Sequence, residues 1–221
     1  MAIKPILFNI EMVRAILEGR KSCTRRLVKP QPDEKHTYPL GFVTDSTEKK
    51  EVGCFGFAAN EYGGSIQYVK PPYRYAPGDI LYVRETWCKG LKRYIYRADY
   101  SDTEKFYRNG KEIEMKWHPS IHMPKEAARI WLKVTDVRVE RLQEITENEA
   151  VKEGIYVANC KDCNAPFGCD TCTDEGYNEI DEFAELWNST IKKSDLDRYG
   201  WDASPYVWVI EFERCEKPEN L

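Results

Sequence analysis

Lys21 and Thr24 stand three residues apart within the densest basic run of the chain, residues 19–26 (GRKSCTRR), with Lys29 just beyond. An amine near a hydroxyl can take its proton, as in lysine-activated hydroxyl nucleophiles. Repulsion from the neighbouring arginines favours the neutral amine that such a base needs. The run therefore predicts a nucleophilic site or a local anion or nucleic-acid site, and its plain alternative is a solvated basic loop.

Glu85 ends a strand pattern whose preceding residues on the same face, Leu81 and Val83, are apolar. A carboxylate in that position is compatible with a partly buried acid at a pocket, able to move protons during catalysis. The alternative is a strand-end carboxylate that pairs with Arg84 or Arg97.

Four cysteines form the strongest spacing signal in the chain: Cys160-x-x-Cys163, five residues, then Cys169-x-x-Cys172. Each pair can place two thiolates on one side of a tight turn, and four thiolates satisfy the tetrahedral preference of Zn²⁺. We therefore predict a structural zinc clip, with an iron centre or two redox pairs as alternatives. The insertion has few apolar residues, so metal binding would supply most of its order.

The remaining histidines and cysteines give weaker signals. His118 and His122 lie in a proline-bounded loop, which favours a structural loop over a helical metal pair, although His122 is a candidate substrate contact. Cys23, between Lys21 and Thr24, is either a rival nucleophile activated by nearby cations or a bystander thiol.

Composition restricts the function classes. The chain has 221 residues, 42% of them hydrophobic, and its 33 Lys plus Arg against 37 Asp plus Glu give a net charge of -4. This charge gives no general attraction to phosphate, so a nucleic-acid surface must be a local patch. We find neither a signal-peptide pattern nor a membrane-spanning run, and we expect a cytoplasmic protein with reduced cysteines and no membrane partner.

The pattern of elements predicts an α+β protein: a small curved sheet with helices packed at its ends. Pro5 favours an edge position for the first strand, and a phase change near Thr135 predicts a bulge in the longest one. Asn109-Gly110 predicts a hairpin. The expected strands span 3–8, 80–85, 94–98, 128–141 and 206–212, with short pieces around Phe55 and Tyr68. The expected helices run from Asn9 to Gly19, from Thr146 to Glu153 and over 180–191.

Gly19-x-Lys21 with Thr24 and Arg26, followed by Gly78-Asp79 leading into Glu85, resembles the ASCH family, which has a PUA-like curved mixed sheet or pseudo-barrel. Further segments resemble a subgroup met in phages and prophages: 82–87 (YVRETW), 119–124 (PSIHMP), 127–129 (AAR) and 206–212 (YVWVIEF). The resemblance implies one domain over 1–221 with insertions at about 31–75, 100–116 and 156–179, the last carrying the cysteines. It also implies a phage-encoded or bacterial protein.

Some bacterial ASCH proteins are amidohydrolases that remove the acetyl group of N4-acetylcytidine, and their working Lys, Thr and Glu fall on Lys21, Thr24 and Glu85. Other members are associated with RNA binding or cleavage, so the partner is a nucleoside or RNA. A non-catalytic RNA-binding module, a ribonuclease and an adaptor that docks a protein through the zinc insertion remain alternatives. The expected substrate or nucleic-acid contacts are Arg20, Arg25, Arg26, Arg84, His122 and Arg129.

Overall fold

The computed structural model describes residues 1–91, 93–108, 110–155 and 179–218. Its centre is a five-stranded mixed sheet with the order β1-β6-β11-β12-β2. The pair β1 and β6 is parallel and the other neighbours are antiparallel. These strands span Ile3–Leu7 (β1), Ile80–Arg84 (β6), Trp131–Arg141 (β11), Tyr206–Cys215 (β12) and Cys23–Leu27 (β2).

The first strand and helix form as their sequence predicts. β1 lies at an edge of the sheet, where Pro5 can be accommodated without a ladder donor. Helix α1 (Ile10–Leu17) is capped by Asn9, whose side-chain oxygen accepts a hydrogen bond from the Met12 amide at 2.8 Å. Gly19 follows the helix at φ +78°, which confirms the predicted stop.

The two longest strands also match their predictions. In β11 the pairing register shifts between Val134 and Asp136, which confirms the expected bulge. β12 is apolar on both faces and lies between β11 and β2, as a buried central strand should. The sheet nevertheless stays open: β1 and β2 are its two edges, and the described strands form no closed barrel.

The second half of the basic run forms strand β2, which excludes the alternative of a solvated loop there. Cys23–Leu27 pairs with β12, with Thr24 opposite Ile210 and Arg26 opposite Trp208. Just before it, Lys21 makes an isolated antiparallel bridge to Glu153. The run is buried because neighbouring carboxylates neutralise it, as described below.

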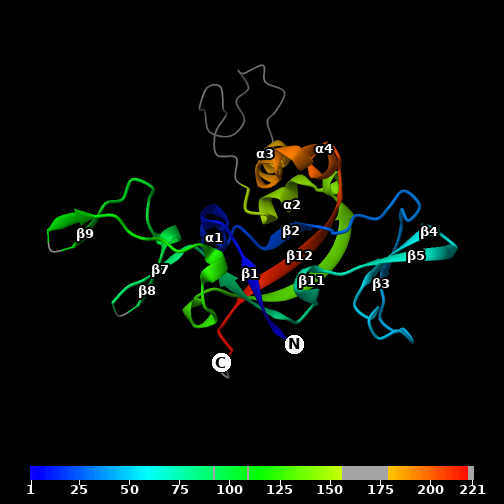
Figure 1. The fold of residues 1–221 in the computed structure, drawn as a ribbon, viewed down its shortest axis with the longest axis horizontal. Coiled ribbons are helices and arrows are strands. Elements are labelled where there is room, and N and C mark those ends of the chain that lie inside the picture. Colours follow the sequence, from blue (N-terminus) through cyan, green and yellow to red (C-terminus); the bar gives the residue numbers. More distant parts are fainter. Residues whose placement is uncertain (92, 109, 156–178, 219–221) are drawn as a thin grey trace, which may run out of the picture.

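Helices α2 (Glu147–Lys152), α3 (Glu179–Thr190) and α4 (Leu196–Tyr199) lie together beside the sheet (Figure 1). Thr146 and Glu149 make both bonds of the predicted capping box at the start of α2. Phe183 and Trp187 of α3 are buried in a cluster with Val207 and Val209 of β12. This packing brings the end of α2 and the inner face of α3 against β2.

Two segments form arms that project in opposite directions from the central sheet (Figure 1). The first arm is a three-stranded sheet, in which strands were expected around Phe55 and Tyr68 but not before them. The second arm carries two small antiparallel pairs, one of them the predicted hairpin around Gly110. The arms consist of β3 (Tyr38–Phe42), β4 (Phe55–Asn60) and β5 (Gly63–Val69), and of β7 (Trp87–Lys89), β8 (Tyr94–Tyr96), β9 (Phe106–Arg108) and β10 (Lys111–Ile113). Over the described ranges, no helix is long and apolar enough to span a membrane.

A substitution at Gly154 tests how closely the end of α2 packs against α1. Gly154 has φ +92°, and a Cβ added there would lie 2.8 Å from the Cβ of Ala15 and 3.2 Å from that of Lys21. We expect Gly154→Ala to lower the free energy of unfolding by roughly 2–4 kcal/mol, from backbone strain and overpacking together. Chemical denaturation measures this loss.

Gly19→Ala is the matched control, because Gly19 also has positive φ but has no atom within 4 Å of the added Cβ. It should lose only about 1 kcal/mol, since it carries backbone strain alone. Equal losses in the two variants would show that the contact between α1, α2 and Lys21 is not tight.

Candidate active site

Lys21 and Arg25 are buried against carboxylates from α2 and β11. The Lys21 amine donates to a carboxylate oxygen of Glu153 at 2.7 Å and to the backbone carbonyl oxygen of the same residue at 2.7 Å. Arg25 lies 3.4 Å from the other carboxylate oxygen of Glu153 and 3.2 Å from both Glu140 and Glu149. We call Lys21, Arg25, Glu153, Glu140 and Glu149 the Lys21 cluster.

Burial changes the chemistry of two side chains at this end of β2. It lowers the pKa of the Lys21 amine, while the contact with Glu153 acts in the opposite direction. It raises the pKa of the Cys23 thiol to about 12, helped by the negative charge of Glu153. Cys23 is therefore a protonated thiol at neutral pH, which argues against its role as a rival nucleophile.

Thr24 has a buried hydroxyl without a hydrogen-bond partner among the described residues. Its side chain is fully buried and lines a cavity of about 250 Å³ between β2 and α3. The walls of this cavity are mostly apolar and include Phe183 and Trp187, and Glu153 also lines it. An unpaired buried hydroxyl costs roughly 1–3 kcal/mol, so this position is unfavourable unless a ligand supplies the missing bond.

Glu85 pairs with Arg129, whereas the sequence analysis had weighed Arg84 or Arg97 as its partner. Arg129 donates to both carboxylate oxygens of Glu85, at 2.8 and 2.9 Å, and also to Asp99 at 2.8 Å. Its guanidinium carbon lies 4.0 Å from the centre of the Tyr96 ring. Burial raises the pKa of Glu85, and the contact with Arg129 opposes that shift.

Phe8 lies between the Lys21 cluster and the strand end that carries Glu85. The Lys21 amine lies 5.7 Å from the centre of its ring, and the guanidinium of Arg26 lies 5.4 Å from it. β1 and β6 pair in parallel with Leu7 opposite Arg84, so the next residues, Phe8 and Glu85, are also neighbours. Phe8 is thus near Lys21 through its ring and near Glu85 through strand pairing, but the carboxylate in contact with Lys21 is Glu153.

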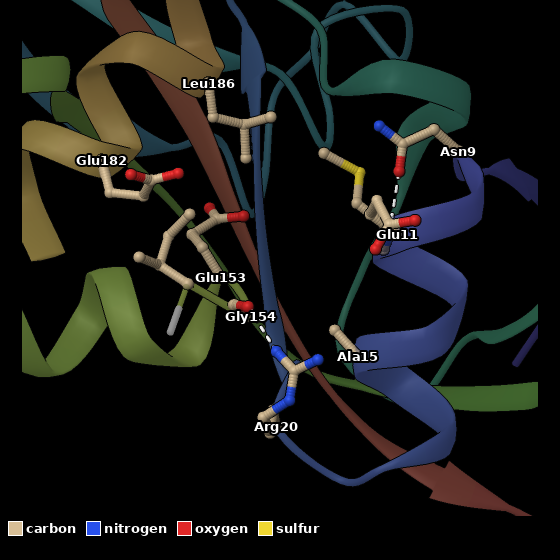
Figure 2. Close-up of a pocket in the computed structure, with 10 residues that line it drawn as sticks. Asn9, Glu11, Ala15, Arg20, Glu153, Gly154, Glu182 and Leu186 are labelled. Atoms are coloured by element: carbon tan, nitrogen blue, oxygen red, sulfur yellow. Dashed lines mark hydrogen bonds between the residues drawn. The ribbon is translucent and has the colours of Figure 1, made fainter. Parts of the chain in front are cut away.

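The expected substrate contacts do not form one basic surface. Arg25 is buried in the Lys21 cluster, and Arg26 donates to the carbonyl oxygen of Leu7. The others lie in two places. Arg20 is half-buried beside Glu18 and donates to the Gly154 carbonyl oxygen, as Figure 2 shows. Arg84, His122 and Arg129 lie around Glu85: Arg84 donates to the Met123 carbonyl oxygen, and the exposed His122 ends the short helix just before Met123.

Sequence reasoning placed Glu153 at a helix end but gave it no role at the site. One signal was available: an acidic residue at the C-terminal end of a helix opposes the helix dipole, which favours cations there. Gly154 after it is the other signal, because the positive φ at that position turns the chain back toward α1 and Lys21. An unfavourable charge at a fixed turn indicates a function or a specific partner.

The predicted metal ligands lie outside the residues that the structure describes. They are Cys160, Cys163, Cys169 and Cys172, and the zinc clip therefore stays a prediction. Within the described ranges no group of three or more His, Cys, Asp or Glu side chains is placed to hold a metal ion. His118 bridges to the backbone of Trp87, as expected of a structural loop.

Comparison of the chain with protein-family models, with curated proteins and with solved structures gave no match. The ASCH resemblance therefore depends on the motifs alone. The geometry offers a buried amine held by a carboxylate, a hydroxyl with no partner among the described residues, and a cavity that this hydroxyl lines. An amine and a hydroxyl are two of the groups that acyl transfer to a hydroxyl uses.

Arg129→Met tests the Glu85 pair. Near neutral pH it should lower the free energy of unfolding by roughly 3–5 kcal/mol, because a buried carboxylate loses its partner. The pKa of Glu85 then rises further above its unfolded value, so the variant should regain stability as the pH falls through that pKa. Urea denaturation near neutral pH and about two pH units lower measures both effects.

The double variant Arg129→Met with Glu85→Gln is the control, since it removes the charge as well as its partner. It should recover most of the stability at neutral pH and lose the extra pH dependence. A loss of stability that is the same at both pH values would show that Glu85 is not left ionised and buried.

Proposed function

We propose that the chain is an ASCH-type hydrolase with a PUA-like core that removes an acyl group from a modified nucleoside, with N4-acylated cytidine as the substrate class. The observation that carries this proposal is the buried hydroxyl of Thr24, which has no described partner and lines a cavity. Lys21 supports it, because its buried amine has a lowered pKa and lies three residues away along the chain.

In the proposed reaction the Thr24 oxygen attacks the acyl carbonyl carbon and its proton passes to the Lys21 amine. The C–N bond of the amide then breaks, and the leaving nitrogen takes a proton from Lys21. Water hydrolyses the resulting threonyl ester, which releases the carboxylic acid and restores the Thr24 hydroxyl. Each step uses groups of this site and water.

Glu85 acts in this proposal as a carboxylate held by Arg129, which can accept a hydrogen bond from the substrate and help to position the leaving amine. Arg129 holds both of its oxygens, so the orientation of the acid is fixed before substrate binds. This preserves the role that the ASCH resemblance gives to Glu85.

Burial of the basic residues supports a small substrate over a polynucleotide. The side chains of Lys21 and Arg25 have 0% exposure and are paired with carboxylates, so they do not present charge to a phosphate backbone. The cavity has Phe183 and Trp187 in its wall, which suit the face of a nucleobase. A volume of about 250 Å³ accommodates a base with its acyl group rather than an oligonucleotide.

Thr24→Val separates catalysis from stability. It keeps the shape of the side chain and removes the unpartnered hydroxyl, so the free energy of unfolding should stay equal or rise by up to about 1 kcal/mol. Release of cytidine from N4-acetylcytidine, followed by chromatography, should fall at least about 100-fold. Lys21→Met should also lose activity, but with a loss of stability from unpaired Glu153.

Cys23→Ala is the matched control, because it alters a buried neighbour of Thr24 that has no role in the reaction. It should keep cytidine release within a few fold of the wild type. A Thr24→Val variant with undiminished hydrolysis would contradict the nucleophile. A wild-type protein that releases no cytidine, but binds single-stranded RNA with strong salt dependence, would favour the RNA-binding alternative.

We further propose that the four cysteines of the insertion hold one structural zinc ion. Four thiolates leave no open position on the metal, so its role would be to order the insertion. Elemental analysis of protein purified without added metal should find about one zinc per chain, and Cys160→Ser should lose it. Wild-type protein with much less than one metal ion per chain would contradict the clip.

A further inference from the structure

Glu153 lines two cavities at once. It contributes to the cavity that contains the Thr24 hydroxyl and to a second one of about 350 Å³ between α1 and α3. Figure 2 shows the second cavity, into which Glu153 projects from the end of α2 and Glu182 from α3. Glu153 is therefore part of the wall of both cavities, and Lys21 is in contact with it.

The position of Glu153 against Lys21 is fixed by backbone as well as side chain. The two residues form an antiparallel bridge, and the Lys21 amine is bound by the carboxylate and by the carbonyl oxygen of Glu153, each at 2.7 Å. Gly154 permits the tight approach through its positive φ. The backbone bridge keeps the two residues close together, which limits how far their side chains can move apart.

Several charged and titratable side chains surround the Lys21–Glu153 pair. On β2, Arg25 faces the other oxygen of Glu153. The charge of Arg26 lowers the pKa of the Lys21 amine, and Cys23 raises it. Glu140 of β11 and Glu149 of α2 lie behind Arg25, and Arg20 reaches the carbonyl oxygen of Gly154. From α1 and α3, the cavity receives Glu11 and Glu182. Glu153 is the carboxylate in hydrogen-bond contact with the amine.

An ammonium cannot accept the proton of Thr24, and Lys21 faces a carboxylate that favours the ammonium. We propose that Glu153 is a positioning residue that takes one proton from Lys21 as Lys21 takes the proton of Thr24. The inference rests on the proposed hydrolase function. When the C–N bond breaks, Lys21 protonates the leaving nitrogen and recovers its proton from Glu153, so the pair returns to its starting state.

Burial supports this exchange, because it lowers the affinity of the amine for its proton and brings it closer to that of a carboxyl group. The contact of 2.7 Å is short enough for direct transfer. If Lys21 passes a proton to Glu153, the enzyme can hydrolyse its substrate even when Lys21 is an ammonium before the reaction begins. If no proton passes to Glu153, hydrolysis requires Lys21 to be a neutral amine before the reaction begins.

The experiment compares two titrations in one protein. The pH dependence of kcat/KM on N4-acetylcytidine gives the acidic limb of activity, and NMR of protein labelled with [13C]lysine follows the protonation of Lys21. In the wild type, activity should persist to pH values at which Lys21 is still an ammonium. In Glu153→Gln, activity near neutral pH should fall roughly 100-fold and the acidic limb should coincide with the Lys21 titration.

Glu140→Gln is the matched control, since it neutralises a carboxylate that contacts Arg25 at 3.2 Å and not the Lys21 amine. It should leave the acidic limb in place. If Glu153→Gln does not fold, Glu153→Asp answers the question, because it keeps an acceptor: its rate should fall while its acidic limb still lies below the Lys21 titration.

A wild-type limb that coincides with the Lys21 titration, or a Glu153→Gln profile identical to the wild type, would overturn the exchange while leaving the hydrolase intact. A wild-type protein with no hydrolysis would overturn both proposals. The two failures are therefore distinguishable.

Discussion

Three charged side chains, Lys21, Arg25 and Glu153, are buried together, and the cost of keeping them from water constrains the elements around them. Removing one member of such a cluster leaves the others uncompensated, at roughly 3–5 kcal/mol. The β2 segment must therefore stay packed against α2 and β11, because the carboxylates of these two elements neutralise its cations. A site built this way is rigid before any ligand arrives.

The same constraint explains local features that otherwise have little in common. Helix α2 ends at Glu153, where a carboxylate opposes the helix dipole, because Lys21 and Arg25 compensate it. Gly154 follows because a side chain there would collide with α1. Next to these ion pairs, the buried hydroxyl of Thr24 has no hydrogen-bond partner among the described residues. A group that destabilises the fold thus lies beside the cluster that constrains it.

Much of the fold could be predicted because its signals are local. The capping box of Thr146 and Glu149 marks α2, the apolar run of β12 marks a central strand, and the phase change at Thr135 marks the bulge. β2 could not be predicted, since five charges in ten residues do not look like a buried strand. Its burial depends on carboxylates that lie 115 to 128 residues further along the chain.

Around the candidate site, the local part of the prediction is confirmed: Leu81, Val83 and Glu85 are all buried, as their alternation indicated. The roles of Lys21, Thr24 and Glu85 stay a prediction from short motifs. The partners of these residues could not be predicted. Arg129 lies 44 residues from Glu85, and Glu153 lies 132 residues from Lys21, so neither pair leaves a local pattern.

The two arms of the molecule contribute no lining residue to either cavity beside Glu153, within the part of the chain that the structure describes. Those walls come from α1, β2, the end of α2 and α3, all on the helical side of the sheet (Figure 1). The first arm still reaches the core, because Phe55 and Phe57 of β4 pack against Trp208 and Tyr206 of β12. A substitution in that arm would therefore act on the cavities indirectly, through the strand on which β2 pairs, whereas a substitution in a cavity wall acts on them directly.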